Sequence, residues 1–450
     1  MTHHSCLRNK LVCRLASFAL AAVSYLATGA TARAVNLVQE FYLPMPEAQI
    51  YQANSAIISG TGSTIASTFS IVVTGAGTVI YYDQWEDGYE TDLGNPAQPS
   101  TQIWGDGNTN NGVAPGYPND LLPQGAVITL TNNVTLPRNP STLLWDARDR
   151  VAATKALVIS RAGWPVSPGP VFAGAVGVLS TLDYGTNYVS PVGQDMTNGL
   201  FKYVGVFVMA AQNNTAVTID PNGNGVGTTN LVLNQGESYL VNGGLKKGGR
   251  VTASKPVQAD LLIGHVGASY ASDWFTLYPV EAWSSTYFTP VGTAASGNPT
   301  YVYLFNPNTN AIVINYTTQS GAGSFPVPGT NGVFQFPMPV ASGASFMSAG
   351  GQNFFAISTV GANPSADTAF NWGFTLVPQA ALTTEVVVGW GPGSADGTVN
   401  GSPVWVTPLA ATRIYVDYKG DHAGLLTDPN GNHYDTNFDL TTLQSKIRRA

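Results

Sequence analysis

The six-residue stretch TAVTID (Thr215–Asp220) alternates in polarity, and variants of it recur three more times along the 450-residue chain. In an extended backbone, Val217 and Ile219 point to one side while Ala216 and Thr218 point to the other, which is the pattern of a half-buried β-strand. A strand that returns four times predicts a repeated β-unit. The other copies are TVIYYD (Thr78–Asp83), NAIVIN (Asn310–Asn315) and TRIYVD (Thr412–Asp417).

A second short β-like run lies upstream of each copy. The copies begin at residues 78, 215, 310 and 412, so they are 137, 95 and 102 residues apart. Turn-forming Asn-Gly and Gly-Gly pairs separate the runs, and helical periodicity is hard to find. The pattern predicts an all-β protein of tandem β-sandwich-like repeats of about 100 residues, with a β-propeller as the alternative. The upstream runs are IVV (Ile71–Val73), VFV (Val206–Val208), YVY (Tyr301–Tyr303) and VWV (Val404–Val406).

The spacing of these elements predicts how the chain is divided. The first interval is the longest because about 40 extra residues, rich in acidic side chains, follow the first copy. We expect the last unit to be incomplete, either a capping half-unit or part of a longer chain, since only 33 residues follow Asp417. The expected parts are a signal peptide (1–34), unit 1 (35–165) with an acidic insert at about 84–123, unit 2 (166–265), unit 3 (266–360) and unit 4 (361–450).

The N-terminus has the composition of a secretory signal. Basic residues (Arg8, Lys10 and Arg14) precede an apolar run at 15–26, and Ala32-Arg33-Ala34 forms an A-x-A site that predicts cleavage before Val35. The apolar run is shorter than the roughly 20 residues that a membrane-spanning helix needs. The sequence therefore predicts a secreted or cell-surface protein without a membrane span.

Charge and cysteine content exclude several classes of function. The chain has 19 basic and 26 acidic residues, and the predicted signal holds four of the basic ones, so the expected mature charge is −11. Nucleic acid is therefore not an expected partner, because it requires clustered Lys and Arg. The two cysteines, Cys6 and Cys13, both lie in the signal, so we expect no disulfide and no thiol chemistry in the mature protein.

The insert in the first unit holds the densest acidic cluster of the chain. Crowded carboxylates without a nearby basic residue suit Ca²⁺, which prefers hard oxygen ligands. A solvated acidic loop is the simplest alternative, and a carboxylate pair that cleaves a glycosidic bond is another. The candidate metal ligands are Asp83, Glu86, Asp87, Glu90 and Asp92, and the candidate ligand-binding aromatic residues are Trp85, Tyr89 and Trp104.

The stretch Val206–His265 carries a series of motifs in a fixed order. These are V-x-V, N-N-T-A-V-T-I, N-Q-G-E-S-Y and R-V-T-A-S-K-P-V. The series resembles the N-terminal region of IgGFc-binding protein and of related bacterial exported β-repeat proteins. The resemblance implies a binding and adhesion role at the cell surface or in the extracellular space, and it transfers no catalytic residue.

Two functions follow from these patterns. The first is an exported, non-enzymatic β-repeat protein that binds an extracellular protein or glycan. It is favoured because the chain has no G-x-S-x-G elbow, no HExxH and no phosphate-binding glycine loop. The alternative is a secreted carbohydrate-active enzyme that uses carboxylates of the acidic insert. Calcium is the one cofactor that the sequence suggests.

Overall fold

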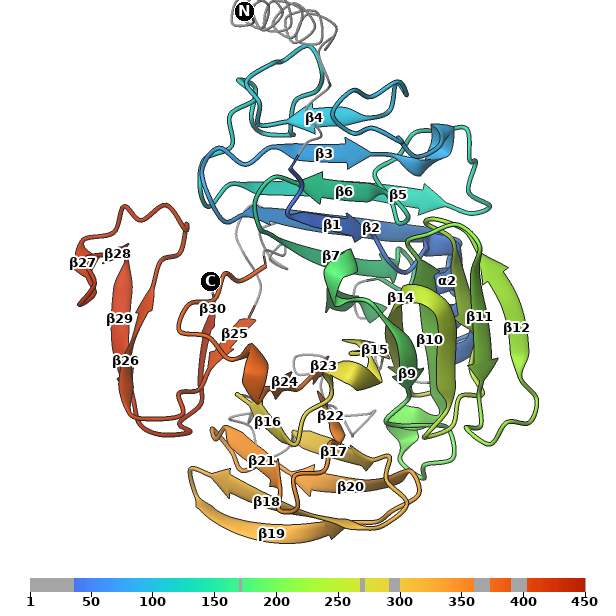
Figure 1. Ribbon diagram of the computed structural model, residues 1–450, viewed down its shortest axis with the longest axis vertical. Helices are drawn as coiled ribbons and strands as arrows, with labels where there is room; N and C mark the ends of the chain where they lie inside the picture. The colour runs from blue at the N-terminus through green and yellow to red at the C-terminus, as the bar shows by residue number, and fades with distance from the viewer. Residues whose placement is uncertain are drawn as a thin grey trace, which may run out of the picture. The chain divides into compact units, whose positions relative to one another are not determined.

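A computed structural model of the chain describes residues 36–169, 172–267, 272–290, 300–359, 373–389 and 403–449 (Figure 1). Most of the regular structure is antiparallel β-sheet, and the prediction of an all-β protein is confirmed. Each of the four recurring hexapeptides contributes at least four residues to a strand, and the four runs upstream of them lie wholly in strands. No helix in these ranges is long and apolar enough to cross a membrane.

The first two sheets pack against one another around a shared apolar cluster. Phe69, Ile71 and Ile128 enter this cluster from one sheet, and Tyr82 and Val151 enter it from the other. The strand orders are β5-β2-β7-β8 and β1-β6-β3-β4. The strands are β1 (Gln39–Tyr42), β2 (Thr64–Val73), β3 (Ile80–Asp83), β4 (Gln102–Trp104), β5 (Val127–Thr135), β6 (Arg150–Ala153), β7 (Leu157–Pro165) and β8 (Gly174–Gly177).

The long strand β14 (Arg250–Gly264) organises the next sheet. Its first residues pair with β9 and β11, and its second half pairs with β10 and β15, with a register irregularity between Thr252 and Val257. Strand β12 extends this sheet beside β11 (Figure 1). Strand β13 pairs with β10. The partners are β9 (Gly185–Val189), β10 (Tyr203–Ala210), β11 (Thr215–Asp220), β12 (Thr229–Leu233), β13 (Ser238–Val241) and β15 (Ser272–Thr276).

Two further sheets follow, with the orders β19-β18-β21-β16-β24 and β20-β17-β22-β23. Val302 and Leu304 of β17 share one large apolar cluster with Val206 and Val208 of β10. The strands are β16 (Thr286–Thr289), β17 (Tyr301–Asn306), β18 (Ile312–Thr318), β19 (Gly321–Val327), β20 (Gly332–Pro337), β21 (Ala344–Ser348), β22 (Phe355–Thr359), β23 (Gly373–Thr375) and β24 (Val377–Pro378).

Six strands near the C-terminus form three two-stranded antiparallel pairs: β25 with β30, β26 with β29, and β27 with β28. Strands β3, β11, β18 and β26, which hold the hexapeptides, pair with β6, β14, β21 and β29 respectively. The division into units at the predicted boundaries stays a prediction. The strands are β25 (Pro403–Val406), β26 (Thr412–Val416), β27 (Leu426–Thr427), β28 (His433–Tyr434), β29 (Thr436–Leu440) and β30 (Lys446–Arg449).

The α-helix α2 (Glu47–Ile57) was not expected from the sequence. Pro46 precedes its first turn, and Ile50, Ala53 and Ile57 are buried at helical spacing. These side chains share an apolar cluster with Phe207 of β10 and with residues of β2, β8 and β14. The helix therefore links the first pair of sheets to the sheet that β14 organises.

Candidate functional site

The acidic insert (residues 84–123) starts directly after β3, where Asp83 is fully buried. The Asp83 carboxylate accepts hydrogen bonds from the Glu90 amide and the Thr101 hydroxyl, both at 3.0 Å. Arg150 Nη1 lies 3.7 Å from the same carboxylate. Burial raises the pKa of Asp83 to about 6 against these opposing contacts. Asp83 therefore anchors the start of the insert to β6.

The other predicted metal ligands also have partners within the protein. Glu86 forms an ion pair with Arg138 and accepts from the Leu144 amide at 3.0 Å. The carboxylates of Asp87, Glu90 and Asp92 accept from the backbone amides of Ser100, Gln98 and Gly94 respectively. No group of three or more His, Cys, Asp or Glu side chains in the described ranges is arranged to hold a metal ion. Calcium binding by the insert stays a prediction.

The aromatic residues singled out in the insert take part in packing. Trp104 is fully buried and stacks on Tyr82, with ring centroids 4.8 Å apart. The Arg148 guanidinium lies 3.9 Å from the ring centroid of Trp85, whose Nε1 donates to Asp146 Oδ1 at 2.9 Å. These contacts place both tryptophan rings in the packing of the fold, and a ligand-binding role for Trp85, Tyr89 and Trp104 stays a prediction.

Two more buried acids lie behind the insert. The Tyr82 hydroxyl donates to Asp149 Oδ2 at 2.6 Å. Burial raises the pKa of Asp149 well above its ordinary value and that of Asp146 to about 7. Arg138 Nε lies 2.6 Å from Asp146. These carboxyl groups are enclosed by the fold, so they are better suited to holding the insert in place than to contacting a substrate.

Tyr89 connects the insert to the turn before β13. Its hydroxyl donates to the Arg148 carbonyl at 2.7 Å, and Arg148 Nε donates to the Gly236 carbonyl at 2.9 Å. The Tyr89 ring packs edge to face against the Tyr42 ring, with the ring centroids 5.6 Å apart. Tyr42 belongs to β1, and Gln235 precedes Gly236, so the insert supports a junction between β1 and this turn.

Gly236 offers a test of that junction. It has a φ of +69°, and a Cβ at this position would overlap the Tyr89 side chain. We expect Gly236→Ala to lower the free energy of unfolding by about 1–3 kcal/mol more than Gly225→Ala, the cost of overpacking. Gly225 has a φ of +78° with nothing within 4 Å of a Cβ, so it controls for backbone strain alone. Equal losses in urea titrations of the two variants would contradict the proposed contact.

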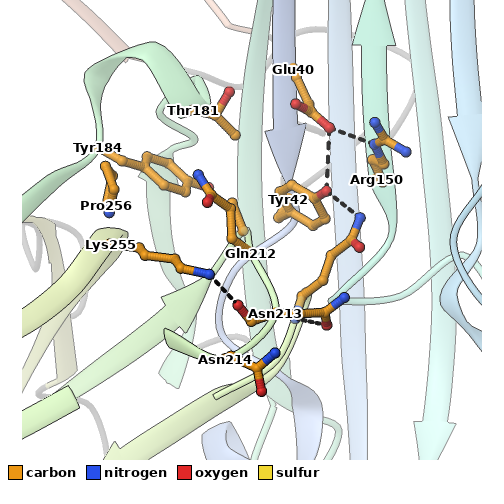
Figure 2. A pocket seen from close by; sticks show the side chains of 12 residues that line it. Glu40, Tyr42, Arg150, Thr181, Tyr184, Gln212, Asn213, Asn214, Lys255 and Pro256 are labelled. Carbon is orange, nitrogen blue, oxygen red and sulfur yellow. Dashed lines mark hydrogen bonds and ion pairs between the residues drawn. The ribbon is translucent and has the colours of Figure 1, made fainter. Parts of the chain in front are cut away.

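A polar pocket of about 540 Å³ lies at this junction (Figure 2). We name it the Tyr42 pocket. One wall comes from β1 and β6. The other comes from the segment before β9, the β10–β11 turn, the turn before β13 and the middle of β14. Its volume is in the range of known ligand sites. The lining residues are Glu40, Tyr42 and Arg150 on the first wall, and Thr181, Tyr184, Ala211, Gln212, Asn213, Asn214, Gln235, Lys255 and Pro256 on the second.

One hydrogen bond joins the two walls, and others order each wall. Gln235 Nε2 donates to the Tyr42 hydroxyl at 2.7 Å, and that hydroxyl donates to Glu40 Oε1 at 3.2 Å. Arg150 Nε donates to the same Glu40 oxygen at 2.5 Å (Figure 2). On the second wall, Lys255 Nζ donates to the Asn213 carbonyl at 2.6 Å. Contacts within the protein therefore fix several of the side chains that line the pocket.

The Tyr42 pocket was not predicted from the sequence, although some predicted site residues contact the residues that line it. Asp83 and Glu90 contact Arg150 from behind the wall, and Tyr89 contacts Tyr42. The lining residues are spread from position 40 to position 256. Some of them, such as Asn213, Gln235 and Lys255, belong to the motif series of Val206–His265, which indicates strands and turns and not a site.

Comparison with known proteins adds one match. The resemblance predicted from Val206–His265 is confirmed, while similarity to bacterial exported proteins stays a prediction. No curated protein and no solved structure matches the chain. Residues 174–385, which include the second wall of the Tyr42 pocket, match the family model described as IgGFc binding protein and are similar to that family.

Proposed function

We propose that this chain is an exported, non-enzymatic binding protein that attaches to an extracellular protein or glycan at the cell surface or beyond it. The observation that carries the proposal is the Tyr42 pocket, a polar cavity whose two walls are joined by the Gln235–Tyr42 hydrogen bond. A preformed site loses less conformational freedom on binding than a flexible one. The family match supports the proposal, because it covers the whole second wall.

The placement of the acidic insert also favours binding over catalysis. Asp83 is enclosed, and Glu86 is held by Arg138 and by a backbone amide. Hydrolysis of a glycosidic bond needs two carboxyl groups facing a substrate at a defined separation. The enclosed carboxyl groups of the insert do not offer that arrangement, so we do not propose an enzyme.

The name of the matched family suggests the first probe. We expect the exported chain to bind the immobilised Fc region of immunoglobulin G saturably in biolayer interferometry. Gln212→Ala and Asn214→Ala should weaken this binding, because both residues line the pocket from an exposed turn. Asn224→Ala is the matched control, since it removes an amide from an exposed turn that does not line the pocket. A chain that binds neither Fc nor any saccharide probe would contradict the proposal.

A further inference from the structure

The charges around the Tyr42 pocket compensate one another. Arg150 contacts the carboxylates of Glu40 at 2.5 Å and Asp83 at 3.7 Å, and it donates to the Glu90 carbonyl at 2.8 Å. Lys255 is the other cation of the lining, and its ammonium donates to the Asn213 carbonyl. The two cations, Arg150 and Lys255, are thus matched in number by the carboxylates of Glu40 and Asp83. Selection of an anionic or cationic ligand needs an uncompensated charge of the opposite sign. The pocket therefore favours a ligand without formal charge.

Uncharged hydrogen-bonding groups make up most of the lining. Within the part of the chain that the structure describes, the side-chain amides of Gln212 and Asn214 have no hydrogen-bond partner. Each amide presents both an N–H donor and a carbonyl acceptor. The second carboxylate oxygen of Glu40 likewise accepts no hydrogen bond from the described residues. A ligand rich in hydroxyl groups matches this set, because each hydroxyl can donate and accept.

A smaller apolar surface faces the same space. Tyr184 lies beside Pro256 on the second wall (Figure 2). The Tyr184 hydroxyl donates to Gln258 Oε1 at 2.8 Å, which holds the ring in place. A fixed aromatic ring next to polar groups suits a ligand that carries C–H faces as well as hydroxyl groups. A purely apolar ligand would leave the amides without partners, at a cost in free energy.

We infer that the Tyr42 pocket binds a neutral saccharide. This inference rests on the proposed function and specifies its ligand class. Gln212 and Asn214 would bind hydroxyl groups at the rim, Glu40 would accept from hydroxyl groups deeper in the pocket, and Tyr184 would contact the ring carbons. The Tyr42 hydroxyl acts indirectly, because it positions Gln235 and Glu40 by hydrogen bonds of 2.7 and 3.2 Å.

The experiment titrates the exported chain with galactose, mannose, N-acetylglucosamine and lactose, read by saturation-transfer NMR and calorimetry. We expect at least one probe to bind saturably with a Kd of about 1 mM or tighter. Gln212→Ala and Asn214→Ala should each weaken it about three- to tenfold, the effect of one lost hydrogen bond. Tyr42→Phe should also weaken saccharide binding. The thermal midpoints of the wild type and of Asn224→Ala serve as the reference that each variant is folded.

The possible results separate the two proposals. Failure of all four saccharides to bind at about 10 mM overturns the saccharide inference, as does binding that Gln212→Ala and Asn214→Ala leave unchanged. If Fc binds in either case, and enzymatic removal of its glycan has no effect, the chain is a protein-binding module and the proposed function stands. Loss of Fc binding when the glycan is removed supports the inference, provided that a free saccharide competes for the same pocket.

Discussion

Replacing Arg161 by methionine is expected to lower the free energy of unfolding by about 3–5 kcal/mol, because it leaves a buried carboxylate without its cation. Arg161 is fully buried, and its Nη2 lies 2.9 Å from Glu47 Oε1. Glu47 also accepts from the Ser67 hydroxyl at 2.6 Å and the Ala147 amide at 3.2 Å. The pair thus joins helix α2 to β7, β2 and the loop before β6.

A double variant separates the charge from the packing. In Arg161→Met with Glu47→Gln, the amide oxygen can still accept from Ser67 and Ala147, and no unpaired charge remains at position 47. We expect the double variant to be more stable than Arg161→Met alone in urea titrations. Arg413→Met is the control, because the Arg413–Asp439 pair at 2.8 Å is solvent-exposed and should contribute little. A double variant no more stable than the single one would contradict the argument.

The strands were predictable because polarity alternation is a local property. TAVTID became β11, and its valine and isoleucine, Val217 and Ile219, are buried as the alternation requires. Helix α2 escaped prediction for a related reason. Its apolar positions are separated by polar residues such as Gln49 and Gln52, and its stability comes from the cluster that it joins. Tertiary contacts of this kind leave little trace in a local pattern.

The candidate site could be predicted only in part. A dense group of acidic residues was visible in the sequence, but the direction of each carboxylate was not. Glu86 forms an ion pair through its Oε1 with Arg138, which lies 52 positions away, so the absence of a basic residue nearby in sequence did not mean the absence of one in space. The Tyr42 pocket needs β1 and the β10–β11 turn to meet, and only the fold brings them together.

Strand β14 shows how far the repeat could be followed. The sequence RVAATKAL (Arg150–Leu157) resembles RVTASKPV (Arg250–Val257). The first copy is divided between two strands, β6 (Arg150–Ala153) and β7 (Leu157–Pro165), whereas the second lies within the single strand β14. The same motif therefore contains a gap between two strands in the first copy and no gap in the second. Continuity is decided by the residues between the two halves and by their partners, since β14 still changes partners near Val257.

Replacing Asp260 by asparagine is expected to stabilise the chain above neutral pH. Asp260 is buried in β14, Gln258 Nε2 donates to its Oδ2 at 3.0 Å, and its Oδ1 has no partner among the residues that the structure describes. Burial raises its pKa from 3.8 to about 7. Because the folded state holds the proton more tightly than the unfolded state, the stability from this group is complete below pH 3.8 and is lost as the pH rises to about 7.

The size of this effect follows from the shift. A change of about three pKa units corresponds to about 4 kcal/mol, so the advantage of Asp260→Asn over wild type should grow by about that amount between pH 4 and pH 8. Asp273, also buried with its pKa raised to about 7, should behave in the same way. Urea titrations at pH 4, 6 and 8 measure the difference directly, and a difference that stays constant would contradict the assignment.

An exposed carboxylate provides a control of opposite sign. The Arg413 guanidinium lowers the pKa of Asp439, so the stability from that pair is present at neutral pH and is lost as the pH falls through the lowered value. Asp439→Asn should therefore destabilise slightly at pH 8 and have no effect at low pH. The stability of each variant relative to wild type should therefore change with pH in opposite directions for Asp260→Asn and Asp439→Asn. That result would attribute the pH dependence to burial at Asp260 and to an ion pair at Asp439.

The Asp260→Asn variant also tests one wall of the Tyr42 pocket. Gln258 connects Asp260 by hydrogen bonds to Tyr184, which lines the pocket. A change in ligand binding by Asp260→Asn would show that this wall depends on the protonation of Asp260.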